Sequence, residues 1–208
     1  MGFDLTGLKP TQRTEEPDIL SRCVTTLNGD EVNEYWNAYR EHSDRNPGVY
    51  FRNNVWYWRP LWNYVCSVCH EVMTQKQMEH GCSNSGGKIN METSRKMYRI
   101  LETLLDAGEV DKAEKEYNEN LKNLPNEECT TCGGTGEKKN NSTGLHHITG
   151  DESDRLVDNT KEADEMVECW TCNGHGEREN WQNNYPFDKD NVRDFCLFLR
   201  DCGGFQIF

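Results

Sequence analysis

Two near-identical cysteine motifs carry the clearest chemical signal in this chain of 208 residues. Both motifs read CxxCxGxG, and a polar segment of about thirty residues separates them. Two thiolates that lie two residues apart can bind one metal ion from a tight turn, and two such turns complete the tetrahedral four-sulfur shell that zinc prefers. The motifs therefore predict one structural zinc ion. Its ligands would be Cys129, Cys132, Cys169 and Cys172.

Glycines follow the cysteines at matching positions of both motifs, as Gly134 and Gly136 in the first and Gly174 and Gly176 in the second. Backbone that wraps around a sulfur-bound metal needs positive φ angles and amides that no Cβ obstructs, and glycine provides both. Two disulfides, four free thiols or a redox CxxC pair are the alternatives. Duplication together with the glycine pattern favours metal binding.

The duplicated motif resembles the cysteine-rich zinc-binding region of DnaJ-type chaperones, which is built from CxxCxGxG repeats whose cysteines bind zinc in pairs of motifs. The resemblance covers about residues 127–178. This chain has two copies where DnaJ-type proteins carry four, which implies one zinc ion rather than two. It contains no His-Pro-Asp tripeptide, the mark of the J-domain that stimulates a partner chaperone. The resemblance therefore implies a zinc module and not a co-chaperone.

A second group of candidate ligands lies nearer the middle of the chain. Cys66 and Cys69 form a further CxxC pair, and His70, His80 and Cys82 follow it. These residues could form a second zinc site with mixed sulfur and nitrogen ligands. The alternative is ordinary core packing, because the two cysteines share one face of a helix and behave there as small hydrophobic residues.

Residues 49–65 are the aromatic centre of the chain. Interface hot spots use Trp and Arg, and aromatic faces can stack a base while an arginine holds its phosphate, so this stretch is a candidate recognition surface. The alternative is that its tryptophans form the core of a protein that is short of aliphatic residues. The candidate residues are Arg52, Asn53, Asn54, Trp56, Trp58, Arg59 and Trp62.

Composition limits the classes of protein to consider. A hydrophobic fraction of 34% with 10% aromatic residues predicts a small core rich in Trp, Tyr and Phe. The net charge of −13 argues against binding to a nucleic-acid backbone. Residues 1–8 lack a basic segment followed by a long apolar run, and no stretch approaches the roughly 18 apolar residues of a membrane span. We therefore expect a soluble cytoplasmic protein with reduced cysteines and no membrane partner.

Apolar spacing and capping residues predict the secondary structure. The first helix should lie on the main core, the third and fourth should form an antiparallel pair, and a terminal strand at residues 205–208 could pair with residues 2–6. The acidic insert at 137–168 contains a candidate short helix around 154–166. It also contains His146 and His147, which could add metal affinity but are interpreted as part of a solvated loop. The five main helices are expected at residues 30–42, 60–69, 90–106, 109–124 and 191–201.

Together these elements predict an α+β fold: a mainly helical domain with a short terminal β element and an inserted zinc-ribbon-like hairpin module. Residues 1–126 would form the helical and aromatic core domain, and residues 127–178 the zinc-binding module with its acidic insert. Residues 179–208 would supply the last helix and strand of the core.

Several separated stretches resemble an uncharacterised family of small proteins from bacteria and tailed phages. That family has no assigned activity, so the resemblance implies the architecture and a microbial or phage origin but no reaction. Its members often have Asn-Asp-Gly where this chain has Asn84, Ser85 and Gly86. The other stretches that carry the resemblance are MGFD at 1–4, YFRNNVWYWRPLW at 50–62 and NVRDFCLFLRDCGGFQI at 191–207.

Two functional hypotheses follow. The first is a non-enzymatic zinc-binding protein that binds a protein partner, as a phage-encoded modulator of a host process. The second is a small-ligand or nucleotide-binding protein, with or without turnover, that uses the cluster from Arg52 to Trp62. The sequence contains no Walker-type phosphate loop, HExxH helix or GxSxG elbow, and Cys196 falls on the apolar face of its helix, so no catalytic residue is predicted.

Overall fold

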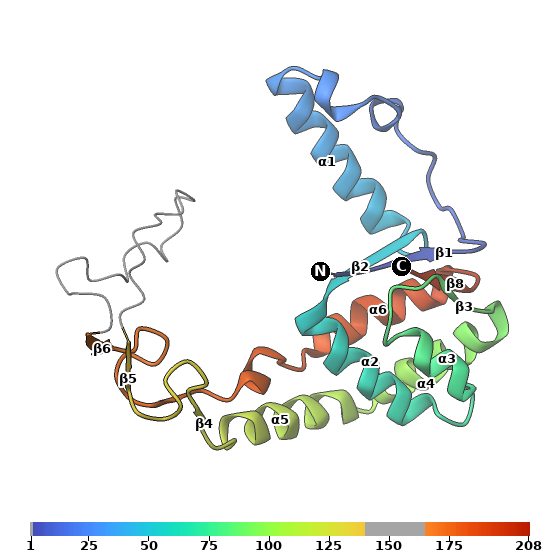
Figure 1. The fold of residues 1–208 in the computed structure, drawn as a ribbon. Helices are drawn as coiled ribbons and strands as arrows, with labels where there is room; N and C mark the ends of the chain where they lie inside the picture. Colours follow the sequence, from blue (N-terminus) through green and yellow to red (C-terminus); the bar gives the residue numbers. More distant parts are fainter. Residues whose placement is uncertain (1, 140–164) are drawn as a thin grey trace. The chain divides into compact units, whose positions relative to one another are not determined.

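The structure is a computed structural model that describes residues 2–139 and 165–208 (Figure 1). It confirms a mainly helical α+β protein. The chain divides into two compact units, which we call unit 1 (Met1–Glu119 with Tyr185–Phe208) and unit 2 (Asn120–Asn184). The two histidines of the acidic insert and most of its candidate helix lie outside the described residues.

Unit 1 contains a four-stranded antiparallel sheet with the strand order β2-β1-β8-β3. Leu5 lies opposite Ile207 and Gly7 opposite Phe205, which confirms the predicted pairing of the two ends of the chain. Alternate residues of the central strands are buried, so one face of the sheet is apolar. The strands are β1 (Gly2–Gly7), β2 (Tyr50–Asn54), β3 (Gly87–Ile89) and β8 (Phe205–Ile207).

Six α-helices lie in the described residues, and α2 and α6 pack against the sheet (Figure 1). Asparagine side chains cap the starts of two of them: that of Asn28 accepts from the amides of Asp30 and Glu31, and that of Asn90 accepts from the amide of Thr93. Short 3-10 turns occur at Asp18–Ser21, Val24–Thr26 and Trp181–Asn184. The helices are α1 (Gly29–Arg45), α2 (Val55–Cys69), α3 (Gln75–His80), α4 (Met91–Asp106), α5 (Glu109–Lys122) and α6 (Lys189–Asp201).

The start of the second long helix was predicted wrongly. Helix α2 begins at Val55 and not at Pro60, because the side chain of Asn54 caps it by accepting from the amides of Trp56 and Tyr57. Pro60 therefore lies inside the helix, where its missing amide hydrogen removes one backbone bond. Burial of the surrounding apolar side chains offsets that loss.

Two predicted helix packings were also wrong. No residue of α1 is buried, and this helix packs on the 3-10 turn at Asp18–Ser21 instead of the main core. Helix α4 packs along α6 and α2, whereas α5 runs away from α4 after Gly108 (Figure 1). Gly108 has a φ of 70°, as expected of a residue that ends a helix.

An aromatic cluster forms the centre of the core. The ring of Trp58 stacks on Phe3 and on Trp62, each with a centroid distance of 5.1 Å, and meets Phe195 edge to face. Its indole nitrogen donates to the carbonyl of Gly81 at 2.7 Å. The polar end of this large buried ring is therefore satisfied.

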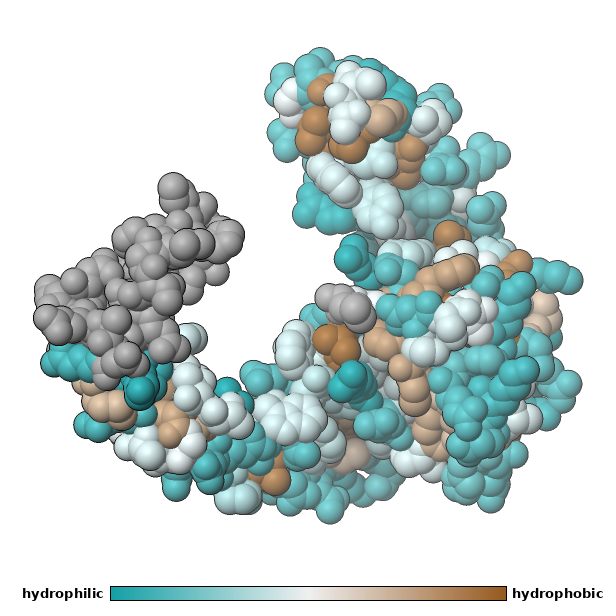
Figure 2. All heavy atoms as spheres, in the orientation of Figure 1, coloured by the Kyte–Doolittle hydropathy of each residue, from teal (hydrophilic) through white to brown (hydrophobic). Residues whose placement is uncertain are grey.

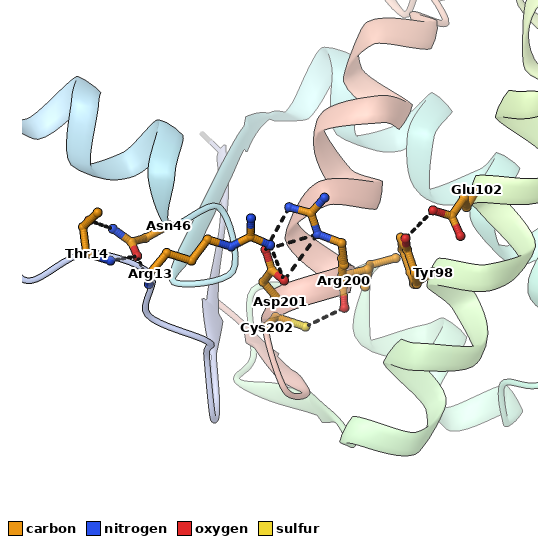
Figure 3. A network of polar contacts seen from close by, with 9 residues as sticks. Arg13, Thr14, Asn46, Tyr98, Glu102, Arg200, Asp201 and Cys202 are labelled. Carbon is orange, nitrogen blue, oxygen red and sulfur yellow. Dashed lines mark hydrogen bonds and ion pairs between the residues drawn. The ribbon is translucent and has the colours of Figure 1, made fainter.

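A polar contact fixes the segment after β1 to the end of α6 (Figure 3). The carboxylate of Asp201, which is 6% exposed, accepts from Arg13 at 2.8 Å and from Arg200 at 3.0 Å. Nearby, the side chain of Asn46 accepts from the amide of Arg13 and donates to the hydroxyl of Thr14. These bonds tie the segment that precedes α1 to two places: to Asn46, directly after α1, and to Asp201 at the end of α6.

Hydrophilic residues cover most of the visible surface, with smaller hydrophobic areas between them (Figure 2). Within the ranges 2–139 and 165–208, no helix combines the length and the apolar character needed to cross a membrane.

Candidate metal centre

The four cysteines of the repeated motif come together in unit 2. Their sulfur atoms all lie within 4.8 Å of one another. The Cys129 and Cys169 sulfurs are 3.9 Å apart, and the Cys132 and Cys172 sulfurs 3.7 Å. Metal–sulfur bonds of about 2.3 Å in a tetrahedron require sulfurs about 3.8 Å apart, since the edge is about 1.6 times the centre-to-corner distance. The cluster therefore has the dimensions of a metal-binding site with four cysteine ligands.

The two motifs fold alike and are related by an approximate two-fold repeat. In each, the amide of the second cysteine donates to the carbonyl of the first, at 3.3 Å. The first cysteine of one motif donates its amide to the last glycine of the other: Cys129 to Gly176 and Cys169 to Gly136, both at 2.8 Å. Each motif is thus completed by the other. Two strand pairs flank them: β4 (Glu127–Glu128) with β7 (Glu177–Arg178), and β5 (Glu137–Lys139) with β6 (Met166–Glu168).

Glycine is required at the end of each motif. Gly136 and Gly176 have φ angles of 77° and 76°, and a Cβ on either would overlap a backbone carbonyl of the opposite motif. Their amides donate to sulfur, from Gly136 to Cys132 and from Gly176 to Cys172, both at 3.3 Å. Both glycines therefore have the positive φ and the accessible amide that the sequence predicts for them.

The thiols of the cluster influence one another's ionisation. Burial raises the pKa of Cys129, but amides of Cys132 and Thr131 and neighbouring thiols outweigh it and lower the pKa to about 6. Hydrogen bonds likewise overcome burial at Cys169 and lower its pKa. Burial and the adjacent thiols raise the pKa of Cys172 to about 11. Cys129 and Cys169 therefore lose their protons more readily than an ordinary thiol, and Cys172 less readily. A divalent cation bound to the cluster would stabilise the thiolate form of all four cysteines.

All ten cysteines lie in described residues and none is in a disulfide. The disulfide alternative for the motifs is therefore absent from this structure. Three of the four sulfur ligands belong to buried residues, and Cys132 is half-buried. Thiols that are shielded in this way suit a structural rather than a catalytic metal site.

The proposed second metal site is not assembled in the described part of the chain. There, the four cysteines of unit 2 are the one group of Cys, His, Asp or Glu ligands gathered closely enough to hold a metal. Cys69 is buried in the core, and burial raises its pKa to about 12. Burial also raises the pKa of Cys66 to about 11. Of the remaining candidates, His80 packs beside Gly87 and Cys82 is exposed.

The aromatic cluster of the predicted recognition surface divides into two parts. Trp58 and Trp62 are 0% and 2% exposed, so these two residues are core, as the alternative interpretation held. Asn54 caps α2, and the side chain of Asn53 donates to Asn191 at 2.6 Å. Trp58, Trp62 and Asn53 are buried in unit 1, and the side chain of Asn54 caps the first turn of α2.

The remaining candidates are exposed. Trp56 is 45% exposed and packs on the ring of Tyr185 at a centroid distance of 4.8 Å. The guanidinium of Arg59 lies over the same ring, 5.6 Å from its centroid. Arg52 lies 3.7 Å from Asp4, with 72% of its side chain exposed. Tyr185 was not singled out from the sequence, because 126 residues separate it from Arg59.

Sequence reasoning also missed the extent of the repeat in unit 2. Glu128 and Glu168 occupy equivalent positions before the first cysteine of each motif, and their side chains pack over Gly134 and Gly174. Asn173 has a φ of 49° where the first motif has Gly133 at 58°. Comparing the motifs residue by residue over a longer window would have found this correspondence.

No family model matches the chain, and no curated protein or solved structure matches it either.

Proposed function

We propose that the four cysteines of unit 2 bind one zinc ion with a structural role, and that the protein is a non-enzymatic binding protein for a protein partner. The observation that carries the proposal is the group of four sulfur atoms within 4.8 Å of one another. Four thiolates fill a tetrahedral shell and leave no position for water or substrate, which is the usual form of a structural zinc site. Small units of this kind obtain much of their folding free energy from the metal.

Zinc is the metal that fits this ligand set best. Thiolates select soft or borderline metals, and tetrahedral four-sulfur sites hold zinc or iron. Substitution by Co²⁺ tests the proposal, because tetrahedral Co²⁺ with thiolate ligands absorbs visible light strongly. We expect that spectrum in the protein, its loss in Cys169→Ser and its displacement by stoichiometric zinc. Failure of zinc to displace Co²⁺ would oppose the assignment.

Exposed aromatic side chains on both units support the partner-binding part. Trp56 in unit 1 and Trp170 in unit 2 are 45% and 43% exposed, and Lys138 lies over the Trp170 ring at 4.8 Å. Trp is enriched among residues that dominate interface energies. A phage-encoded modulator of a host process is part of the same proposal.

Affinity capture from bacterial lysate tests this part with Trp56→Ala and Trp170→Ala in the full chain. We expect one specific protein to be captured, and one of the two variants to lose it while its thermal unfolding stays unchanged. Tyr57→Ala, another exposed aromatic change on α2, is the matched control. No specific capture, together with a thermal shift on adding nucleotides, would favour the ligand-binding hypothesis instead.

A further inference from the structure

A nearly apolar pocket lies in unit 1 between α2, α5 and the segment that precedes α6. Its volume is about 230 Å³, room for several water molecules at about 30 Å³ each. Three aromatic rings, those of Tyr64, Tyr117 and Phe187, line it together with Pro60, Asn63, Ser67 and Ala113. Water in such a pocket finds few hydrogen-bond partners, so a ligand that displaces it gains free energy.

The aromatic rings are held in place before any ligand binds. Phe187 is 3% exposed, with the ring of Tyr64 5.0 Å away on one side and that of Tyr117 5.9 Å away. The backbone of Phe187 is bound to α5 twice, because its amide donates to Asn118 at 3.0 Å and its carbonyl accepts from Asn118 at 2.8 Å. Glu114 also accepts from the amide of Lys189 at 2.9 Å. A preformed pocket binds without the cost of ordering its walls.

An acidic residue of α5 lies near the pocket. None of the lining residues is itself charged. Glu109 precedes Ala113 and Tyr117 by four and eight residues on α5, which places it on the same face of that helix. Burial raises the pKa of Tyr64, with smaller electrostatic contributions from Cys69 and Glu109. Glu109 also forms an ion pair with Lys112, but this pair is exposed and therefore weak. Lys112 consequently cancels little of the attraction between Glu109 and a cationic ligand.

We propose that this pocket binds a methylated organic ammonium group, in which methyl groups surround the positive charge. Aromatic faces attract a cation, and the attraction grows when the site excludes water. A methylated ammonium suits a pocket that offers rings and few hydrogen-bond acceptors. An unmethylated ammonium would lose hydration there without replacing its hydrogen bonds.

The competing occupant is an uncharged apolar group, and a matched pair of probes separates the two. Choline and 3,3-dimethyl-1-butanol have nearly the same shape, but only choline is charged. Calorimetric titration of the full-length protein at constant ionic strength should show saturable binding of choline, at least about tenfold tighter than that of the neutral alcohol. Equal affinity for the two probes, or no saturable binding of choline, would overturn the proposal.

Substitutions at Tyr117 test whether the aromatic ring is responsible, since this residue is 37% exposed and can be changed without emptying the core. Tyr117→Leu should weaken choline binding about tenfold, whereas Tyr117→Phe should retain it. Tyr57→Leu removes an equally exposed ring outside the pocket and should have no effect. Unchanged choline affinity in folded Tyr117→Leu would contradict the assignment.

A peptide containing trimethyllysine, compared with free choline, identifies the source of the ligand. Tighter binding of the peptide assigns the site to a methylated protein, and tighter binding of choline to a small molecule. All lining residues belong to unit 1, so this site and the zinc site fail or succeed independently.

Discussion

Gly136 has no room for a side chain, because a Cβ there would overlap the carbonyl oxygen of Gly174. Its left-handed φ would itself cost an alanine about 1–2 kcal/mol. We therefore expect Gly136→Ala to destabilise unit 2 by about 2 kcal/mol or more and to release its metal to a chelator at lower concentration.

Gly133→Asn provides the matched control for Gly136→Ala. Gly133 also has positive φ, but no atom lies closer than 4.0 Å to its would-be Cβ, and the second motif has Asn173 at this position. This variant should retain its metal and change the stability by about 0.5 kcal/mol or less. Equal metal loss in both variants would mean that steric overlap is not what requires glycine at position 136.

The two tryptophans on either side of Tyr57 have opposite roles. Trp58 is fully buried and Trp56 is 45% exposed. Trp58→Ala should lower the free energy of unfolding of unit 1 by about 3–5 kcal/mol, since it leaves a large cavity. Trp56→Ala should lower it by about 1 kcal/mol or less, the value of an exposed aromatic contact. Urea unfolding followed by circular dichroism measures both, and similar losses would contradict the division of this cluster into core and surface.

At the scale of elements, α6 anchors the chain that leads to α1 through the carboxylate of Asp201. Asp201→Asn removes the charge that Arg13 and Arg200 share and should cost about 1–3 kcal/mol. Solvent screens both ion pairs and limits this cost, because the side chains of Arg13 and Arg200 are 48% and 33% exposed. Limited proteolysis should then cut the segment before α1 sooner.

Lys96→Ala is the control for Asp201→Asn, because it breaks an ion pair on α4 whose members are both more than half exposed. It should leave the cutting rate unchanged. If both variants are cut at the same rate, the Asp201 contact does not hold this segment.

The elements that could be predicted are those with local signals. Helices α4 and α6 have apolar residues at helical spacing and side-chain caps, and both appear at nearly the predicted residues. The start of α2 was missed because a proline such as Pro60 is common in the first turn of a helix. Asn54 is recognised as the cap only when the end of β2 at this residue is known. The surface position of α1 was missed because helical spacing predicts an amphipathic face but not the part of the protein against which that face packs.

At the scale of the whole molecule, the difference between local signals and tertiary packing explains why one site could be predicted from the sequence and the other could not. The four-cysteine cluster could be predicted because each motif contains two cysteines at fixed spacing, and the repeat itself supplies the other two. The aromatic pocket could not, since Tyr64, Tyr117 and Phe187 come together only through the packing of α2, α5 and the segment before α6. No periodicity or motif in the sequence relates these three residues to one another.

The metal content of the purified full-length protein tests the central claim most directly. Plasma emission spectroscopy should find one zinc ion per chain, lost in Cys129→Ser and in Cys172→Ser and retained in Cys23→Ser, which changes an exposed cysteine of unit 1. Absence of zinc from the folded protein, or its retention after either of the first two substitutions, would contradict the claim that these four cysteines form a structural zinc centre.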